Sequence, residues 1–316
     1  MGCRVLITGC SGYLASVLIE QCVGDPDFEW VGGIDMREPR SKHGWSFHML
    51  DVRDKALADI IRENKVDTLV HLAWIFNPTH DPELEYSVDV EGSKNVLEAC
   101  RSAGVSYILY LSSTTAYGAH PDNPQEMDEE HPRRGHPKFL YSKHKAIVDE
   151  LFLDFIRENP GIKVCMYRAP IVLGPNTRNF VTDIAGMRFM FGVSGYDPPM
   201  QFMHEDDMAG LLYWSLKNRP VGVYNVSSTG VMRYSEVARL LGKRLMRLPA
   251  WLIYPLTSLG WSLRLLSFPP AVLDFIRYPW VAKTEKFTSQ YPSVIKHSSE
   301  EAVRDFAKAR WPEKFS

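Results

Sequence analysis

The first two thirds of the chain alternate short apolar runs with amphipathic stretches. Each run is bounded by polar or turn residues, which is typical of strands buried on both faces of a sheet. The predicted strands are 4–8, 29–35, 66–74, 105–113, 162–170 and 221–228. Helical spacing of apolar residues follows the first strand and returns at 54–64, 89–103 and 141–158. This alternation predicts an α/β fold, a Rossmann-type, doubly wound parallel sheet covered by helices on both faces.

The turn after the first strand has the pattern of a dinucleotide-binding site. The segment TGCSGYLA at 8–15 lies between a predicted strand and a predicted helix. Gly9 permits a sharp turn, Gly12 lets the backbone approach a pyrophosphate, and Ala15 fits the strand–helix contact. Free N–H groups and the dipole at the helix N-terminus favour a phosphate there. The plainer interpretation is a turn without a ligand, but the strand–turn–helix setting favours the dinucleotide.

An acidic residue ends the second predicted strand. Asp35 lies 23 residues after Gly12, where a carboxylate accepts hydrogen bonds from the adenosine ribose hydroxyls. Its charge would repel a 2′-phosphate, so the sequence favours NAD over NADP. Arg37 and Arg40 weaken this preference, because an arginine beside the ribose accepts such a phosphate.

A tyrosine and a lysine share one face of the predicted helix 141–158. They are Tyr141 and Lys145, four residues apart in YSKHK. A free tyrosine has a pKa of about 10, so its action as a base near neutral pH needs a shift worth about 4 kcal/mol. A positive charge ~4 Å away, at an effective dielectric constant of ~20, is worth about that much, and Lys145 and an oxidised nicotinamide ring, both positive, would together supply it. Ser113, at the end of a predicted strand, is the candidate that holds a substrate oxygen, with Thr114 as a neighbour that shares the role.

Together these motifs make the sequence resemble the extended short-chain dehydrogenase/reductase superfamily, in its NAD-dependent epimerase/dehydratase branch. The resemblance runs from residue 4 to about 228 and weakens beyond. It is carried by TGCSGYLA, Asp35, LDV (50–52), HLAW (71–74), DVEGSKNVLEAC (89–100), SSTTAYG (112–118), YSKHK, RAPIVLGP (168–175), HEDDMA (204–209) and VYNVSS (223–228).

The resemblance implies roles for residues in these motifs. The implied catalytic set is Ser113, Tyr141 and Lys145. The implied cofactor-binding residues are Gly9, Ser11, Gly12, Tyr13, Leu14, Asp35, Met36, Arg37, Asp51, Val52, Leu72, Ala73, Trp74, Tyr141, Lys145, Pro170 and Ile171. Among these, Asp51 and Val52 would touch the adenine, and Pro170 and Ile171 would lie beside the nicotinamide. The candidate substrate residues are Thr114, Thr115, Arg178 and Gln201.

The resemblance also implies a division of the chain and an assembly. Residues 1–174 plus 201–228 are expected to form the NAD-binding Rossmann domain. Residues 175–200 plus 229–316 hold many prolines and little strand pattern, and are expected to form a smaller, mostly C-terminal substrate-binding region. The family's usual homodimer would use the helices near 92–102 and 141–157.

Four positions depart from the family pattern. Asp89 stands where Asn is usual, Ile171 where sugar-nucleotide enzymes often have Asn, and Trp74 where a small residue is usual. Gln201 stands where many of those enzymes carry an arginine for the nucleotide phosphates, and an arginine is the best bidentate ligand for phosphate. Arg178 is the candidate to replace it.

Composition excludes several other classes of protein. The chain has 36 Lys and Arg against 38 Asp and Glu, a formal net charge of −2, so nothing favours a nucleic-acid partner. The five cysteines are odd in number and scattered, without a C-x-x-C pair, which fits a reducing cytoplasm and predicts no disulfide framework and no zinc site. No signal peptide is expected, because the first strand begins within a few residues of the start. His120, His131 and His136 do not have the spacing of a metal site.

Residues 250–276 are notably apolar but are interrupted by Pro255, Gly260, Arg264 and the pair Pro269–Pro270. Three interpretations are open: a packed or lid-like part of the substrate region, an interfacial contact with a membrane, and a membrane span, which needs about 20 apolar residues. The first is favoured, and peripheral membrane contact is kept as a candidate partner.

The sequence therefore predicts an NAD-dependent oxidoreductase. Tyr141 would remove the hydroxyl proton while a hydride passes to NAD. An epimerase-like reaction on a sugar nucleotide is the first hypothesis, and oxidation or reduction of a hydrophobic alcohol or ketone, as in hydroxysteroid dehydrogenases, is the alternative. Dehydration is disfavoured because TTA replaces the acidic pair usual beside the active-site hydroxyl in dehydratases. A hypothesis of another class is a sensor that binds NAD without turnover.

Overall fold

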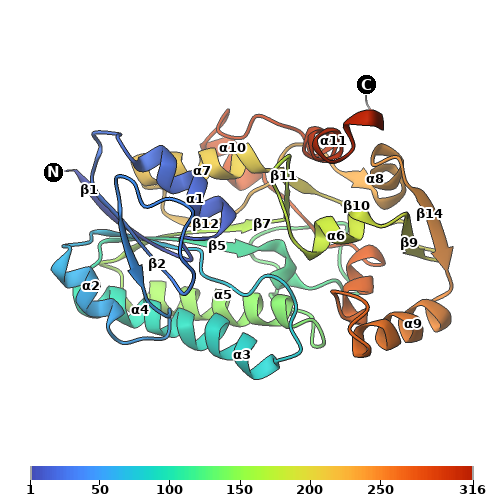
Figure 1. Ribbon diagram of the computed structural model, residues 1–316, viewed down its shortest axis with the longest axis horizontal. Helices are drawn as coiled ribbons and strands as arrows, with labels where there is room; N and C mark the ends of the chain where they lie inside the picture. The colour runs from blue at the N-terminus through green and yellow to red at the C-terminus, as the bar shows by residue number, and fades with distance from the viewer. Residues whose placement is uncertain (1, 315–316) are drawn as a thin grey trace.

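The apolar runs become neighbouring strands of one sheet. The computed structural model describes residues 2–314, and its central sheet has seven parallel strands in the order β12-β7-β5-β4-β1-β2-β3 (Figure 1). The strands are β1 (Cys3–Thr8), β2 (Phe28–Asp35), β3 (Ser46–Met49), β4 (Thr68–His71), β5 (Tyr107–Ser113), β7 (Lys163–Ala169) and β12 (Gly222–Asn225). The prediction of a Rossmann-type parallel sheet is confirmed. Strand order reverses between β1 and β4, and in such sheets ligands bind at the carboxyl ends of the strands at that point.

The strand β3 was not predicted. It lies at the edge of the sheet, pairs only with β2 in the described part of the chain, and its side chains are half-buried or exposed. An edge strand with solvent on one side does not need the continuous apolar run that marks its buried neighbours.

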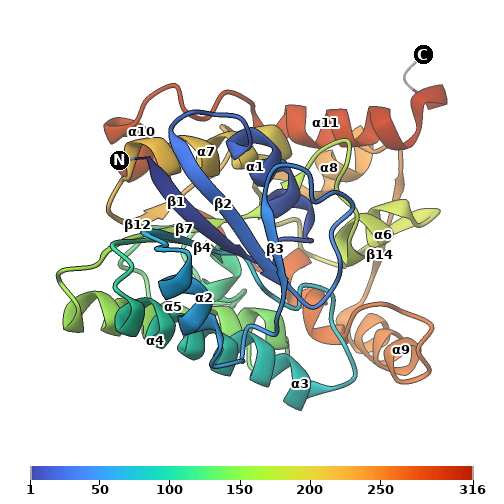
Figure 2. The same ribbon diagram turned by 60° about the vertical axis from the view of Figure 1, so that its left-hand side comes forward.

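Helices cover both faces of the sheet, as Figures 1 and 2 show. One face carries α1 (Tyr13–Cys22), α7 (Glu205–Asn218) and α10 (Glu285–Gln290), and the other carries α2 (Leu57–Glu63), α3 (Pro82–Tyr86), α4 (Gly92–Ala103) and α5 (Leu140–Glu158). The alternation of side chains along β1 feeds two separate cores: Val5 and Ile7 pack beneath α1 and α7, while Leu6 packs beneath α2 and α4. This two-sided burial explains why the strands are apolar throughout.

The helix predicted at 89–103 begins with an irregular turn. Residues Ser87–Glu91 form a single π-helical turn, η1, and regular α-helix starts only at Gly92. Such turns are rare and often lie at functional sites. Asp89 is fully buried in this one.

The remaining segments form a smaller layer at one end of the sheet, on the right of Figure 1. They pair in short two-stranded sheets rather than lacking strands. The pairs are β8 (Ile171–Leu173) with β11 (Phe202–His204), β10 (Pro199–Met200) with β13 (Met232–Arg233), β9 (Phe189–Val193) with β14 (Arg244–Leu248), and β6 (Glu126–Met127) with β15 (Val281–Ala282). The helices here are α6 (Phe180–Gly186), α8 (Tyr234–Leu240), α9 (Ala250–Ser262) and α11 (Ser299–Arg310), with short 3₁₀ turns η2 (Thr114–Tyr117), η3 (Pro270–Ile276) and η4 (Pro312–Lys314).

The apolar segment 250–276 divides into two parts. Its second half, η3, places Leu273 and Phe275 in the core of the smaller layer. The first half, α9, leaves much of its apolar surface exposed, including Trp251 and Leu259. Among residues 2–314, no helix is both long enough and apolar enough to cross a membrane.

Candidate active site

The glycine turn between β1 and α1 has a shape that only glycine at position 9 allows. Gly9 has φ +69°, and a Cβ atom there would lie 2.7 Å from Cα of Ala73, at the end of β4. Gly12 donates to the carbonyl of Gly9 (2.9 Å) and is the N-cap residue of α1. No side chain of the described residues caps the N-terminus of this helix, so its first N–H groups remain available to a ligand. They lie at the carboxyl ends of β1 and β4, where a pyrophosphate would bind. Ser11, Tyr13 and Leu14 belong to this same turn and first helical residues.

Asp35 ends β2 beside the glycine turn. One carboxylate oxygen accepts from the backbone N–H of Ser11 (3.1 Å) and the other from that of Arg37 (2.9 Å). Each oxygen has a second lone pair for a ribose hydroxyl. Met36 and the Arg37 side chain are exposed beyond it, so the rim of this site is open.

The residues expected to touch adenine lie after β3. Asp51 forms an ion pair with Arg53 (2.6 Å), and the hydrogen bonds from Arg53 hold the pKa of Asp51 below its usual value. Val52 is buried against the first turn of α4, where a Cβ on Gly92 would lie 2.6 Å from its Cγ1.

Ser113 and Tyr141 meet although 28 residues separate them. Ser113 ends β5 and Tyr141 lies in the first turn of α5, and their side chains are hydrogen-bonded. The Ser113 hydroxyl also accepts from Oγ1 of Thr115 (2.9 Å). Trp74 and Phe76, from the loop after β4, contact the Tyr141 ring edge-on, with centroids 6.1 and 5.1 Å away. The phenol is therefore held between a serine and aromatic edges.

Lys145 is buried one helical turn after Tyr141. Its Nζ donates to the carbonyl of Leu111 (2.9 Å) and lies 3.5 Å from the centroid of the Trp74 ring, a close cation–π contact. Burial lowers the pKa of Lys145 to about 7, so the amine is only partly charged at neutral pH.

Burial also controls the tyrosine. It raises the pKa of Tyr141 above its ordinary value, and the hydrogen bond with Ser113 opposes this only in part. Loss of hydration is the largest effect on the phenol, and the lowering of this pKa by Lys145 and an oxidised nicotinamide together stays a prediction.

Two buried donors near this pair have no hydrogen-bond partner within residues 2–314. They are Nε1 of Trp74 and the hydroxyl of Thr114, which follows Ser113. An unpaired buried donor lowers the stability of the fold by about 1–3 kcal/mol, so such groups usually bind a ligand or a water molecule. A nicotinamide dinucleotide offers hydroxyl, phosphate and amide acceptors, and these residues therefore fit one.

The other candidate residues are distributed around this centre. Leu72 and Ala73 donate their N–H groups to the hydroxyl of Thr8 (3.2 Å each), which fixes the end of β4 beside the glycine turn. Pro170 is buried between β7 and β8, and Ile171 begins β8.

Two substrate candidates are occupied by local contacts. The Arg178 guanidinium donates to the carbonyls of Pro175 (3.0 Å) and Thr177 (2.7 Å) in its own loop. The Gln201 amide exchanges two hydrogen bonds with the backbone of Ala282 (3.2 Å each) and so ties β10–β11 to β15.

Three residues at the site were not assigned a role from the sequence. Phe76 was missed because a lone aromatic residue in a loop gives no periodic signal. His144 is within YSKHK, but its only sign was its place between Tyr141 and Lys145. Asp89 was noted only as a departure from the family. The structure places these two together: Oδ2 of Asp89 lies 3.0 Å from Nδ1 of His144, and both are buried.

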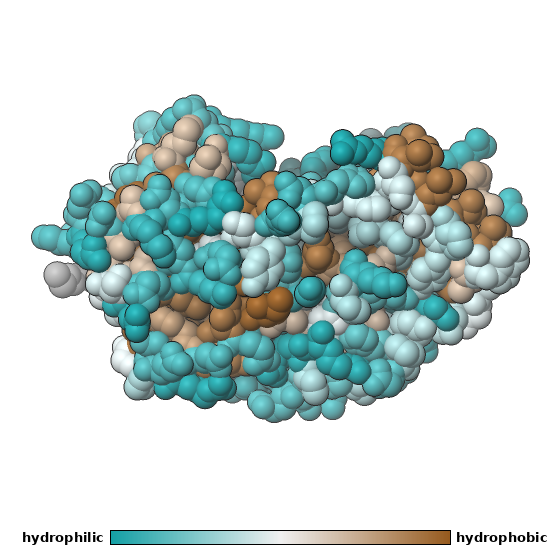
Figure 3. Space-filling view, turned by 90° about the horizontal axis from the view of Figure 1, so that it is seen from below, coloured by the Kyte–Doolittle hydropathy of each residue, from teal (hydrophilic) through white to brown (hydrophobic). Residues whose placement is uncertain are grey.

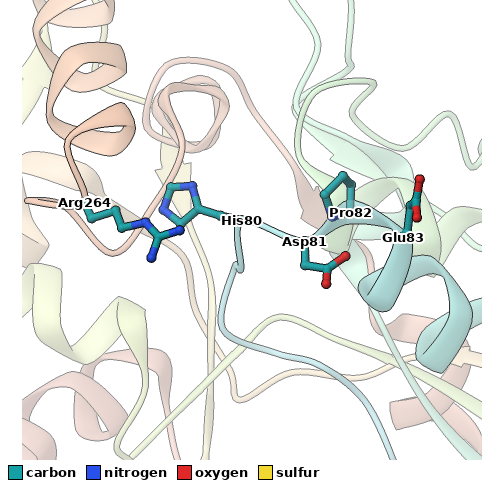
Figure 4. Close-up of a pocket in the computed structure, with 5 residues that line it drawn as sticks. All are labelled: His80, Asp81, Pro82, Glu83 and Arg264. Carbon is teal, nitrogen blue, oxygen red and sulfur yellow. The ribbon is translucent and has the colours of Figure 1, made fainter.

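A separate surface pocket of about 520 Å³ lies between the start of α3 and the segment after α9 (Figure 4). His80, Asp81, Pro82, Glu83 and Arg264 line it. The ring of His80 stacks on that of Trp261 from α9, with centroids 3.8 Å apart. Since Ser113, Tyr141 and Lys145 do not line it, this pocket is distinct from the catalytic centre.

A glycine turn at the switch point of a doubly wound sheet, with a tyrosine–lysine pair at the neighbouring strand end, defines a nicotinamide-dependent oxidoreductase of the short-chain type. Comparison with known proteins agrees: the model of the NAD dependent epimerase/dehydratase family matches residues 5–227. The chain belongs to the NAD-dependent epimerase/dehydratase family, as its motifs predicted, and is an NAD-dependent enzyme.

Three similar proteins are between 22% and 29% identical to the chain in sequence. The chain is 29% identical over 274 residues to N-acetyl-alpha-D-glucosaminyl-diphospho-ditrans,octacis-undecaprenol 4-epimerase of Escherichia coli O157:H7, covering 82% of this chain and 78% of that protein. It is 28% identical over 190 residues to the decarboxylating sterol-4-alpha-carboxylate 3-dehydrogenase of Saccharomyces cerevisiae, covering 56% and 53%. Its fold is similar to the crystal structure of Thermus thermophilus UDP-glucose 4-epimerase in complex with NAD, with a TM-score of 0.73, 22% identity, and coverage of 97% and 98%.

Proposed function

We propose that this enzyme epimerises a sugar carried on a diphosphate by oxidising one hydroxyl and then reducing the ketone from its other face. The observation that carries the proposal is the convergence of Ser113, Tyr141 and Lys145 at the end of β5, beside the glycine turn. NAD bound at the glycine turn would supply the hydride acceptor for the oxidation and, once reduced, the hydride donor for the reduction. This reaction is supported by the similarity to the Escherichia coli 4-epimerase and by the fold shared with the Thermus thermophilus UDP-glucose 4-epimerase.

The chain's own residues handle the proton and the oxygen. Tyr141, as the phenolate, takes the proton from the substrate hydroxyl and later gives it back to the alkoxide. Ser113 holds the substrate oxygen and keeps it within reach of the phenol. Lys145 supplies a positive charge that favours the phenolate once the oxidised cofactor is in place and would bind its ribose hydroxyls.

The cofactor and domain assignments complete the proposal. Residues 1–174 plus 201–228 would bind NAD and residues 175–200 plus 229–316 the substrate. The cofactor would contact the glycine turn, Asp35 to Arg37, Asp51 and Val52, Leu72 to Trp74, and Pro170 and Ile171. Thr114 and Thr115 adjoin Ser113 and are the substrate residues nearest to the chemistry; Arg178 and Gln201 would have to release their present partners to bind a phosphate.

A hydrophobic alcohol or ketone is the second candidate substrate. Aromatic rings gather around Tyr141: Trp74, Phe76, Phe139 and, behind Phe76, Phe180. Such a lining suits a flat apolar molecule better than a sugar, and the yeast sterol dehydrogenase is a relative that acts on one. An NAD-binding sensor without turnover is the candidate from another class.

Replacing Tyr141 with phenylalanine tests the reaction. The variant keeps the ring contacts with Trp74 and Phe76 but loses the proton acceptor. Turnover should fall at least ~100-fold, while NAD affinity by calorimetry stays within about twofold. Tyr196→Phe, on an exposed loop, is the matched control and should leave both unchanged. Wild-type-like turnover in Tyr141→Phe would refute the mechanism.

A substrate panel separates the remaining candidates. It contains UDP-sugars, a sugar on a polyprenyl diphosphate and a sterol-like secondary alcohol. Interconversion of sugar epimers supports the first proposal, and NADH formation with the sterol-like alcohol supports the second. Tight NAD binding with no reaction on any member would support the sensor.

We also propose a cytoplasmic homodimer. All five cysteines are free thiols, which suits a reducing compartment. Half-buried apolar side chains, including Ile147, Leu151 and Ile156, lie along α5 next to α4. Figure 3 shows apolar surface over these two helices, left of centre. Sedimentation equilibrium should give a dimer, and Leu151→Arg a monomer.

Residues 250–276 are proposed to touch a membrane surface peripherally through α9. Trp251 and Leu265 are each 76% exposed, and Leu256, Leu259 and Leu263 are also exposed. The segment 250–263 carries no charged residue, while exposed Arg247 and Arg264 flank it. The apolar surface at the right of Figure 3 lies over this helix. An apolar face with a tryptophan and flanking arginines suits the interface of an anionic bilayer.

A further inference from the structure

Asp89 is a carboxylate with no access to water. It lies in the π-helical turn η1 and is 0% exposed. Burying a charge in this way is costly unless each oxygen is bonded. Both are: Oδ1 accepts from the backbone N–H of Ile75 (2.9 Å), and Oδ2 pairs with Nδ1 of His144 (3.0 Å). The backbone N–H of Ile75 donates to one oxygen, and His144 donates to the other when its Nδ1 carries the proton. Burial raises the pKa of Asp89, and these two bonds oppose that rise and favour the ionised carboxylate.

These two bonds join Asp89 to two segments of the catalytic centre, the loop after β4 and helix α5. Ile75 lies between Trp74, whose ring carries the Lys145 amine, and Phe76, whose ring contacts Tyr141. His144 directly precedes Lys145 in α5. Asp89 therefore connects the loop of Trp74 and Phe76, which contacts Tyr141 and Lys145, with helix α5, which carries both residues.

Two acidic residues lie near Lys145, and they differ in their partners. Asp149, one turn further along α5, also favours the charged amine, but Arg168 of β7 pairs with it at 2.6 Å and Ser112 donates to it as well. Among residues 2–314, no arginine or lysine bonds to Asp89; its side-chain partner is a histidine.

The other groups that face the amine carry no negative charge at neutral pH. His71 of β4 is buried and its pKa is lowered to about 3, mainly by burial and then by Lys145 itself, so it is neutral. The hydroxyl of Tyr110 on β5 lies 3.5 Å from Nζ, and burial raises the pKa of Tyr110 and of Tyr141, so both are protonated. Asp89 is thus the acidic group near Lys145 that no arginine or lysine of the described chain neutralises.

We propose that Asp89 is a positioning residue that, through Ile75 and His144, holds Trp74 and Lys145 together and keeps the Lys145 amine charged, thereby setting the upper pH limit of catalysis. The proposal rests on the function proposed for Lys145. Because burial already weakens the charged amine, losing a nearby negative charge would make the amine neutral at a lower pH.

The test is Asp89→Asn, which keeps the shape and the acceptor for the Ile75 N–H but removes the charge. We expect a folded protein that binds NAD, with the alkaline limb of the pH profile of kcat moved down by on the order of one unit. A ¹⁵N-lysine NMR titration of Lys145, assigned with Lys145→Arg, should move by the same amount. This second readout needs neither cofactor nor substrate, so it remains informative if the proposed reaction is wrong.

Two further variants separate charge from shape. Glu85→Gln is the matched control: Glu85 is buried and holds Thr79 of the same loop, but its hydrogen bonds do not reach α5, so both titrations should stay in place. His144→Gln can still donate to the charged Asp89, so the limb should stay at or above the wild-type pH, and this variant decides the question if Asp89→Asn does not fold. Superimposable Lys145 titrations in Asp89→Asn and wild type, or a downward shift in His144→Gln, would overturn the proposal.

Discussion

The turn at Gly9 gives the most direct test of the nucleotide-binding geometry. Gly9→Ala would place a Cβ 2.7 Å from Cα of Ala73 and 2.8 Å from its nitrogen, well inside contact distance. It would also force alanine to adopt φ +69°, a left-handed conformation that costs about 1–2 kcal/mol. Both obstacles are backbone, so β1 or the loop after β4 must move, which typically costs a further ~1–3 kcal/mol.

The expected loss of stability is therefore about 2–5 kcal/mol, out of the roughly 5–15 kcal/mol typical of a folded protein. Moving the loop would also displace the Leu72 and Ala73 N–H groups from Thr8 and disturb the start of α1. NAD affinity should fall at least ~100-fold in calorimetry, and urea unfolding should report the stability loss.

Gly24→Ala is the matched control for this experiment. Gly24 also has a left-handed backbone, φ +84°, but apart from Gly24 and its two chain neighbours no atom of the described residues lies within 4 Å of where its Cβ would be. This variant should show only the conformational cost of about 1–2 kcal/mol and bind NAD normally. Equal stability loss in the two variants, with NAD affinity retained in Gly9→Ala, would refute the close approach of β1 to the loop after β4.

Three further perturbations have defined outcomes. His71 is buried between Thr8 (2.8 Å) and Ser93 (2.9 Å), and its pKa is lowered to about 3. In the unfolded chain the imidazole binds a proton near pH 6.5. The free energy of unfolding should therefore fall by about 4 kcal/mol as the pH drops from about 6.5 towards 3. Urea unfolding across this range measures the fall, and a His71 ring that titrates near pH 6.5 in NMR would contradict it. Asp149→Asn leaves the fully buried Arg168 without its carboxylate, and unfolding experiments should show a loss of about 3–5 kcal/mol, whereas a loss below about 1 kcal/mol would show that the pair is not needed. The double variant Trp251→Ser with Leu265→Ser should weaken cosedimentation with phosphatidylglycerol vesicles at least tenfold. The control is Val221→Ser with Val231→Ser, two residues that are also exposed but lie outside 250–276. Equal binding by both double variants would rule out the α9 contact.

The strand–turn–helix pattern and its motifs were sufficient to predict the fold class, the family and the cofactor. These features are local: β1, the glycine turn and α1 are consecutive, and Tyr141 and Lys145 lie four apart on one helix. Burial on both faces makes every core strand apolar, so periodicity finds these strands without any knowledge of their partners. The edge strand β3 was missed for the same reason, since solvent on one side removes that signal.

The environment of the catalytic pair could not be predicted in this way. The sequence offered only charges, those of Lys145 and an oxidised nicotinamide, to shift the pKa of Tyr141, whereas burial raises the pKa of Tyr141 and lowers that of Lys145. Desolvation depends on everything packed around a group, here the rings of Trp74 and Phe76 brought in from a loop some 65 residues earlier. The bonds of Gln201 to Ala282 likewise join segments about 80 residues apart.

What the sequence determined by itself is thus the order of elements, the glycine turn after β1 and the spacing of Tyr141 and Lys145 on one helix, because each depends on neighbours along the chain. What the tertiary structure decided is which groups share the low-dielectric space around Lys145. Asp89 is 56 residues from Lys145 in the chain, and only the packing of η1 against α5 brings its buried carboxylate beside the helix that carries Lys145.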